Sequence, residues 1–192
     1  MLVIGVSGAP GSFSEEAAIT YARKHRLRRR KVEYLISAEG VLDALEEGRV
    51  DLGIFPIENL NGGLVDETVE AMSGHNFRIE RLFNIEVHQN LLVKNGMTAS
   101  RVRKITSHIQ ARLQCERYLQ RQWSHTPFED YADTAKAAED LASGKLPATT
   151  AVIASLTAAR VYGLKVLEPS IHDDKFNFTR FIAARQRQTG HR

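Results

Sequence analysis

The alternation of short apolar runs with longer helical segments constrains this chain more than any other feature. Over residues 1–72 the expected strands are 2–6, 32–36 and 51–57, and the expected helices are about 13–25, 38–48 and 65–72. Two parallel strands need a crossover connection between them, and that connection is usually a helix packed on the sheet. We therefore expect a mixed, mostly parallel sheet with helices on both faces.

The middle of the chain repeats this pattern after a long strand-like stretch, 77–93, that is long enough to pass from one lobe to another. The further expected strands are 102–106, 128–131, 151–154 and 164–167, and the further expected helices are 109–121, 134–143 and 156–162. The predicted fold class is α/β with two lobes and a ligand cleft between them. The first lobe is predicted to contain 1–80 plus 168–192, and the second 81–167.

Composition excludes several classes of protein. With 192 residues, 43% of them hydrophobic, the chain can bury a core of its own. Its single cysteine, Cys115, rules out an intrachain disulfide framework and a cysteine-cluster metal site. The basic stretch 23–31 contains no interleaved aromatic residues, so it is interpreted as the solvated end of a helix rather than a nucleic-acid surface.

Localisation and cofactor use follow from what the sequence lacks. The apolar start is too short for a signal peptide, and no window approaches the roughly 20 apolar residues that cross a bilayer, which predicts a cytoplasmic protein with no membrane partner. The spacing of Gly8 and Gly11 matches neither a dinucleotide fingerprint nor a phosphate-binding loop. The seven histidines form no paired helical ligand motif, so neither a nucleotide cofactor nor a metal is expected.

Polar residues gather at five predicted strand ends or helix starts, where α/β sheets expose their ligand-binding loops. Three of these clusters open helices, whose free N–H groups favour an anionic ligand with one or two carboxylates. The clusters are 8–15, 56–59 with Gly62 and Gly63, 107–110 with Gln114, 133–135, and the run Asn177-Phe178-Thr179-Arg180-Phe181.

The run 177–181 places a hydroxyl beside a guanidinium near the end of the chain. In a strand, Phe178 and Arg180 would point to one side, and Asn177, Thr179 and Phe181 to the other. An ordinary edge strand with one polar face is the alternative interpretation of this run.

Several other polar residues have simple structural explanations. Ser107 is the better candidate for a helix N-cap than His108, for which a structural or capping role is favoured over a general acid. Glu58 is interpreted either as a catalyst or as a carboxylate tied to backbone donors. Asp133 is expected to cap a helix, and Cys115 to be a small core residue rather than a nucleophile.

Taken together, these clusters resemble the prephenate dehydratase family over nearly the whole chain. The matching features, in the family's order, are Gly11-Ser12-Phe13-Ser14-Glu15 with Ala17-Ala18, Pro56-Ile57-Glu58-Asn59 with Gly63 and Val65, His88 with Leu91-Leu92, Ser107-His108 with Gln110-Ala111 and Gln114-Cys115, Thr134 with Ala137-Ala138, and Asn177 with Thr179-Arg180-Phe181. Each motif is weak alone, but six in the same order are unlike a chance match.

The resemblance implies a periplasmic-binding-protein-like fold of type II, no cofactor, and homodimers or homotetramers. It implies the decarboxylating dehydration of prephenate to phenylpyruvate in phenylalanine biosynthesis, a carbon–oxygen lyase reaction. Carried over by position, Thr179 is the catalytic hydroxyl. The expected substrate-binding residues are Ser12, Glu58, Asn59, Ser107, Gln110, Gln114, Thr134, Asn177 and Arg180.

The chain departs from the family pattern at three positions. Leu60 stands where the family usually has serine, Ile109 replaces a usual proline, and Ser12 replaces a usual threonine. Loss of the hydroxyl at position 60 is expected to lower substrate affinity or change the accepted ring, because a ligand group would lose its partner. The chain also stops soon after Phe181, so control by phenylalanine through a C-terminal ACT domain is not expected, unless phenylalanine binds the cleft itself.

Three other functions fit the same fold. A prephenate decarboxylase would need no donor at the leaving hydroxyl, so the presence of Thr179 argues against it. A hydrolase of a small amide or ester would use a serine or threonine nucleophile with His88 or His108 as base, but nothing in the sequence places hydroxyl, imidazole and carboxylate together. A non-catalytic binder of an aromatic amino acid is the third.

Overall fold

The computed structural model describes residues 1–60, 62–174 and 176–187, and the chain divides into two compact units. Unit 1 contains residues 1–9, 13–86 and 178 onward, and unit 2 contains 10–12 and 87–177. The boundaries predicted from the sequence, 80/81 and 167/168, therefore fall too early. The reason is that β5 (Phe77–Glu86) and β11 (Phe178–Gln186) stay paired along their whole length, up to the pair Phe178 and Glu86.

Unit 1 is built on a six-stranded mixed sheet with the order β2-β1-β3-β11-β5, with β4 added beside β3. Besides β5 and β11, its strands are β1 (Leu2–Val6), β2 (Arg30–Tyr34), β3 (Leu52–Asn59) and β4 (Gly63–Leu64). The pairs β1–β2 and β1–β3 are parallel, as the crossover pattern predicts, whereas β11 is antiparallel to both of its neighbours. Because β11 lies between β3 and β5, its interpretation as an edge strand is wrong.

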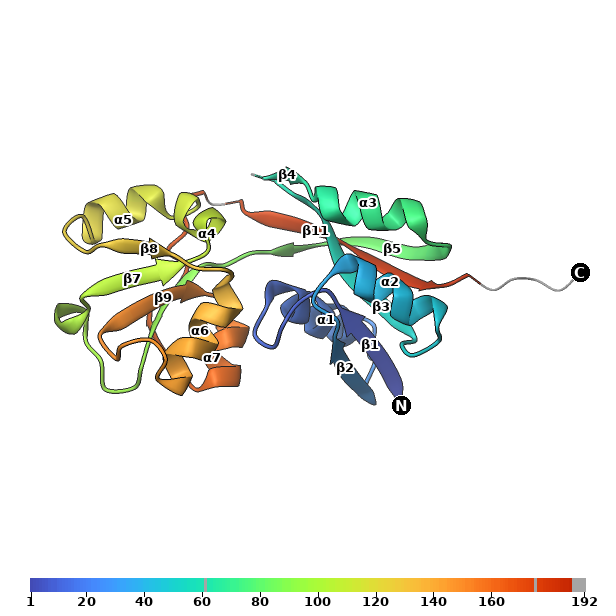
Figure 1. Ribbon diagram of the computed structural model, residues 1–192, viewed down its shortest axis with the longest axis horizontal. Helices are drawn as coiled ribbons and strands as arrows, with labels where there is room; N and C mark the ends of the chain where they lie inside the picture. The colour runs from blue at the N-terminus through green and yellow to red at the C-terminus, as the bar shows by residue number, and fades with distance from the viewer. Residues whose placement is uncertain (61, 175, 188–192) are drawn as a thin grey trace, which may run out of the picture. The chain divides into compact units, whose positions relative to one another are not determined.

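Helices cover both faces of this sheet (Figure 1). Helix α1 (Phe13–Lys24) packs through Ala17, Ala18 and Tyr21 on one face, against the strand residues Ile54 and Phe181. Helices α2 (Ala38–Glu46) and α3 (Asp66–Gly74) cover the other face. The spacing of their apolar residues puts one buried stripe on each helix, which is the pattern of an amphipathic helix on a sheet.

Unit 2 contains a five-stranded sheet with the order β10-β6-β9-β7-β8. These strands are β6 (Asn90–Val93), β7 (Lys104–Ser107), β8 (Phe128–Asp130), β9 (Thr150–Ala154) and β10 (Lys165–Glu168). Helices α4 (Ile109–Leu113) and α5 (Glu116–Gln122) cover one face, α6 (Thr134–Ser143) and α7 (Leu156–Tyr162) cover the other, and a short 3-10 helix spans Ala99–Arg101. The predicted strand 77–93 is thus two strands, one in each unit.

The predicted single helix 109–121 is wrong, because it breaks at Gln114 and Cys115. The carboxylate of Asp173 accepts hydrogen bonds from the backbone N–H groups of Arg117 (2.7 Å) and Tyr118 (2.9 Å), and so stabilises a separate N-terminus for α5. The capping residue comes from a distant part of the chain, which is why local periodicity did not reveal the break.

The Gly-rich loop 10–12 belongs to unit 2, although its neighbours belong to unit 1. Ser155 Oγ donates to the carbonyl of Gly11 at 2.7 Å, and Tyr162 donates to the carbonyl of Pro10 at 2.8 Å. Gly11 has a φ of 83°, and a Cβ there would lie 3.0 Å from Ala158 Cα. Glycine is therefore required at position 11 both by conformation and by space.

No helix in the described part of the chain is long and apolar enough to span a bilayer.

An ion-pair cluster around Asp140 stabilises α6. The hydroxyl of Tyr131 donates to Asp140 at 2.7 Å, and the ammonium groups of Lys136 and Lys145 each lie 3.1 Å from the same carboxylate. The Tyr131 hydrogen bond first, and then the two lysines, outweigh the opposing effect of burial and hold the pKa of Asp140 at about 2.

Because the folded pKa of Asp140 lies below its ordinary value of 3.8, the charged carboxylate stabilises the fold above about pH 4, and this contribution is lost as the pH falls toward about 2. Asp140→Asn should therefore lower the melting temperature at pH 7, and the melting curves of variant and parent should converge between about pH 4 and 2. Glu139→Gln, at the exposed neighbouring carboxylate, is the control and should change little. Equal destabilisation at pH 7 and pH 2 would contradict the ionic explanation.

Candidate functional site

A hydroxyl and an amide face each other across strands β3 and β11 of unit 1. Thr179 pairs with Asn59 in the strand register, and Asn59 Nδ2 donates to Thr179 Oγ1 at 2.8 Å. Thr179 is only 8% exposed, and Phe181, on the same side of the strand, is fully buried. The alternation predicted for residues 178–181 is therefore confirmed, with Thr179 and Phe181 turned inward and Arg180 exposed.

The hydrogen bond leaves the Thr179 proton available. A hydroxyl can accept and donate at once, and Asn59 uses one of the acceptor lone pairs of Thr179. Within the described residues, no acceptor takes the proton of Thr179 Oγ1. The geometry thus presents a largely buried hydroxyl whose oxygen is fixed and whose proton is free to be donated to a ligand.

The hairpin after β3 fixes the orientation of Asn59. Its Oδ1 accepts a hydrogen bond from the backbone N–H of Gly62 at 3.0 Å, while Asn59 pairs with Gly63 in the short strand β4. Gly63 has a φ of 76°, a conformation that favours glycine. The contacts with Gly62 and Gly63 therefore hold the oxygen end of the Asn59 amide and aim its nitrogen at Thr179.

Arg180 and Glu58 form an ion pair on the opposite side of the same two strands. Arg180 Nη1 lies 3.1 Å from Glu58 Oε2, and Arg180 Nε donates to Asn84 Oδ1 at 3.3 Å. Glu58 is therefore tied to a guanidinium rather than to backbone donors, and the pair is half-exposed rather than buried. Leu60 is 61% exposed and lines a small pocket of about 140 Å³ with Glu58, Asn84, Phe178 and Arg180.

Three side-chain amides meet in unit 2. Gln114 Oε1 accepts from Asn177 Nδ2 at 2.9 Å and from Gln89 Nε2 at 3.0 Å. Asn177 and Gln89 are buried, and their own amide oxygens have no donor within the described part of the chain. Buried acceptors without a donor are costly, so these oxygens favour an N–H or O–H group supplied by a water or a ligand. Gln89 was not among the predicted site residues, and no sequence signal distinguished it.

The capping role favoured for His108 is confirmed, whereas the prediction that Ser107 is the better N-cap is wrong. His108 is the N-cap of α4, and its Nδ1 accepts a hydrogen bond from the N–H of Gln110 at 3.2 Å. Ser107 is fully buried, and its hydroxyl donates a hydrogen bond to the carbonyl of Ile153 at 2.6 Å. Serine is usually preferred as an N-cap, but Ser107 does not cap α4 because it is still part of strand β7. Gln110 is exposed on the first turn of α4.

The remaining predicted site residues lie at helix starts. Asp133 caps α6 by accepting from the N–H of Lys136 at 2.7 Å, as predicted, and Thr134 is the first residue of that helix. Ser12 directly precedes α1 and is half-buried. Cys115 is fully buried, and burial raises the pKa of its thiol, so it is a core residue as predicted and not a nucleophile.

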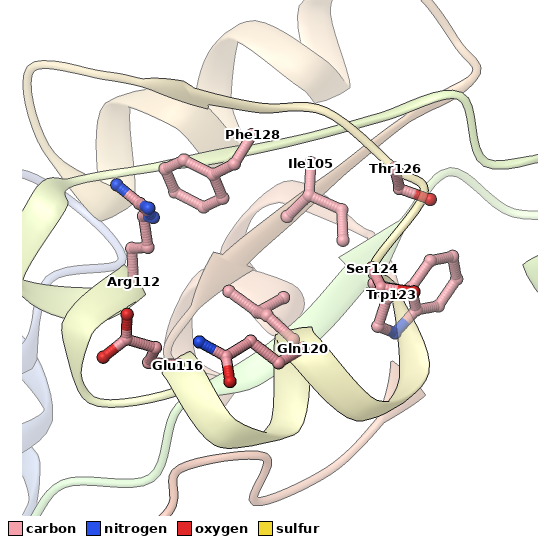
Figure 2. Close-up of a pocket in the computed structure, with 9 residues that line it drawn as sticks. Ile105, Arg112, Glu116, Gln120, Trp123, Ser124, Thr126 and Phe128 are labelled. Atoms are coloured by element: carbon pink, nitrogen blue, oxygen red, sulfur yellow. The ribbon is translucent and has the colours of Figure 1, made fainter.

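A pocket of about 320 Å³ opens in unit 2, and none of the residues that line it is a predicted site residue. Figure 2 shows Arg112 beside the ring of Phe128, with Glu116 and Gln120 of α5 below them and Trp123 near the other end. The Arg112 guanidinium lies 5.5 Å from the centre of the Phe128 ring, within cation–π range.

The prephenate dehydratase family profile matches residues 4–189, almost the whole chain. The chain belongs to the prephenate dehydratase family. Its resemblance to that family, inferred from six weak motifs, is confirmed.

Among characterised relatives, the chain is 34% identical over 182 residues to arogenate dehydratase/prephenate dehydratase 6 of Arabidopsis thaliana. This match covers 94% of the chain and 42% of the relative. Among solved structures, a prephenate dehydratase from Arthrobacter aurescens in complex with L-Phe superposes with a TM-score of 0.87 at 24% identity, over 98% of this chain and 61% of that one. GqqA, described as a novel type of quorum quenching acylase, superposes with a TM-score of 0.84 at 25% identity, over 98% of this chain and 65% of that one.

The predicted two-lobed α/β fold is confirmed as well, except that the sheets are not mostly parallel: β11 is antiparallel to both of its neighbours in unit 1, and β6 is antiparallel to both of its neighbours in unit 2. A periplasmic substrate-binding protein of an ABC transporter from Coxiella burnetii shares the fold at a TM-score of 0.50, with 14% identity over 95% of this chain and 84% of that one.

Proposed function

We propose that this chain catalyses the decarboxylating dehydration of prephenate to phenylpyruvate, with Thr179 as the catalytic residue. The observation that carries the proposal is the inward Thr179 hydroxyl, whose oxygen accepts from Asn59 and whose proton has no acceptor among the described residues. Membership of the prephenate dehydratase family supports the choice of substrate class.

The chemistry sets what the protein must supply. Prephenate loses a ring carboxylate as carbon dioxide and a hydroxyl as water, and aromatisation of the ring drives the reaction. Hydroxide is a poor leaving group unless it receives a proton or a strong hydrogen bond. A threonine is too weak an acid to transfer its proton unaided, so Thr179 donates a hydrogen bond to the departing oxygen, and preorganised donors and positioning lower the rest of the barrier.

The other predicted residues remain candidates for binding the two carboxylates and the hydroxyl of prephenate. Arg180 supplies a half-exposed guanidinium for a carboxylate. Asn177 supplies a buried amide oxygen that can accept from the hydroxyl, and Gln114 orients the Asn177 amide. Ser107 is the weaker candidate as a donor, because its proton is already given to Ile153. The roles of Ser12, Gln110 and Thr134 rest on the family resemblance alone.

Conversion of added prephenate, followed by the ultraviolet absorbance of phenylpyruvate, tests the proposal directly. Turnover by purified chain without added metal or nucleotide is expected. Absence of turnover, together with calorimetric binding of phenylalanine, would favour the non-catalytic amino-acid binder instead. Loss of carbon dioxide without phenylpyruvate would favour the decarboxylase.

Substitution of Leu60 tests the departure from the family pattern. Leu60→Ser restores a hydroxyl at an exposed position beside Glu58, and is expected to lower KM for prephenate by roughly tenfold, the value of one recovered hydrogen bond. Leu60→Ala removes the same bulk without adding a hydroxyl and is the matched control. Equal KM values in the two variants would show that the hydroxyl itself has no role.

Amide hydrolysis is a second candidate, and one contact favours it. Ser170 Oγ lies 3.2 Å from His88 Nδ1, which places a hydroxyl beside one of the two predicted bases. Ser170 has a φ of 51°, an unusual conformation for a residue other than glycine. The similarity to GqqA supports testing a small amide, with loss of hydrolysis in Ser170→Ala as the expected result.

We also propose that the chain forms homodimers or homotetramers. Strand β5 is at the edge of its sheet and exposes two large apolar side chains, Ile79 at 45% and Leu82 at 55%. An edge strand with exposed apolar side chains is a place where a second copy can pair.

A further inference from the structure

A cluster of one imidazole and three carboxylates links helix α2 to the end of helix α3 in unit 1. His75 Nε2 lies 3.2 Å from Glu39 Oε1 and 3.8 Å from Asp43 Oδ1, while His75 Nδ1 faces Glu46 Oε2 at 3.3 Å. Glu39 and Asp43 are one helical turn apart on α2, so their side chains project from the same face. None of these residues takes part in the proposed reaction.

The histidine side chain is held in place before any ligand arrives. It is only 8% exposed, and its buried Nδ1 makes no hydrogen bond within the described residues, because the carboxylate of Glu46 lies outside hydrogen-bonding geometry. Glu46 is itself fixed, since its Oε1 accepts from the backbone N–H of Asn76 at 2.7 Å. The ring is therefore buried on one side and directs Nε2 toward two exposed carboxylates.

The charges of the cluster are unbalanced. No lysine or arginine among the described residues forms an ion pair with Glu39, Asp43 or Glu46, although basic residues outnumber acidic ones in the chain as a whole, 26 against 23. Three carboxylates outweigh the single imidazole in charge, so the cluster attracts a cation.

We propose that Glu39, Asp43 and His75 form a binding site for Zn²⁺ or a similar borderline divalent metal. One ligand atom from each residue already lies within 4.8 Å of the other two. Donor atoms bonded to zinc at about 2.0–2.2 Å in a tetrahedron lie about 3.4 Å apart, close to the 3.2 Å and 3.8 Å separations from His75 Nε2.

The carboxylates can complete the approach by small rotations, because their side chains are 60% and 52% exposed. The fourth position is left to water.

Glu46 would act as a positioning residue for this site. Metal-binding histidines usually donate their other ring N–H to a carboxylate or carbonyl, which orients the ring and strengthens its binding. A small rotation of His75 would turn the 3.3 Å contact between Nδ1 and Glu46 into such a hydrogen bond. The imidazole also selects the metal, because Mg²⁺ and Ca²⁺ prefer oxygen ligands alone.

Calorimetric titration of tag-free protein with Zn²⁺, and visible absorption with Co²⁺, test the proposal without an activity assay. One saturable metal per chain is expected, with no competition from excess Mg²⁺ or Ca²⁺. His75→Gln and the double variant Glu39→Gln/Asp43→Asn should each weaken binding more than about 100-fold, and Glu46→Gln about 10- to 100-fold. The double variant keeps the test valid if His75→Gln fails to fold, because it changes exposed positions on α2.

Glu67→Gln/Glu70→Gln is the matched control, since both residues are exposed acidic positions on α3 outside the cluster. It should bind Zn²⁺ as the parent does. Absence of saturable binding, or equal affinity in parent and in the Glu39/Asp43 double variant, would overturn the proposal and leave the cluster as ion pairs of a protonated histidine. Turnover of prephenate does not enter the test, so the two proposals stand or fall separately.

Discussion

Replacement of Thr179 by alanine is expected to lower the turnover of prephenate by about 10²- to 10⁴-fold, the usual contribution of one positioned donor to a departing group. The hydroxyl is largely buried and is oriented by Asn59 Nδ2 at 2.8 Å. Its loss removes the group that eases expulsion of the hydroxyl, and it also leaves the Asn59 amide without this acceptor. Rates of phenylpyruvate formation measure the effect, with kcat falling more than KM.

Two further variants separate the chemistry from the fold. Thr179→Ser keeps the hydroxyl and should retain most of the activity, whereas Thr179→Val keeps the shape and should be as slow as the alanine variant. Similar melting temperatures for the serine variant and the parent would show that β11 is intact. Unchanged phenylpyruvate formation in Thr179→Ala would remove Thr179 from the mechanism, whatever the family resemblance implies.

Replacement of Phe181 by alanine is expected to destabilise unit 1 by about 3–5 kcal/mol, the usual cost of emptying a buried aromatic site. Phe181 is 1% exposed and lies in the core between the sheet and α1. Its ring is stacked at 5.9 Å on Phe83, the residue paired with it on β5. The cavity would therefore open between the sheet and α1, over the paired residues of β11 and β5 and two residues from Thr179.

Urea unfolding followed by circular dichroism measures this loss as a lower midpoint. Leu113→Ala is the control, because that side chain is 51% exposed and its truncation should change stability by less than about 1 kcal/mol. Phe181→Leu keeps most of the apolar volume and should fall between the two. A midpoint for Phe181→Ala equal to that of the control would contradict the packing assigned to β11.

Sequence rules predicted correctly those helices whose limits depend on residues close by in the chain. Apolar spacing and capping residues predicted α6 and α7 with the bounds that the structure has, and Asp133 as the cap of α6. Strand alternation placed Thr179 and Phe181 on one side and Arg180 on the other, and the structure shows that the side of Thr179 and Phe181 is the buried one. The family was predicted from the order of the six motifs, because each motif specifies which side chains lie at the end of a strand or at the start of a helix.

The sequence by itself thus determined the α/β class, the family and the shared side of Thr179 and Phe181, because these depend on residue type and on periods of two or 3.6 residues. Only the tertiary structure decided that β11 is a central strand, that Asp173 divides 109–121 into two helices, and that Asn59 fixes the Thr179 hydroxyl. It alone also brought His75 to Glu39 and Asp43. Each of these features depends on which distant segments of the chain become neighbours. Strand pairing and the packing of helices on sheets determine those neighbours, and local sequence patterns do not predict them.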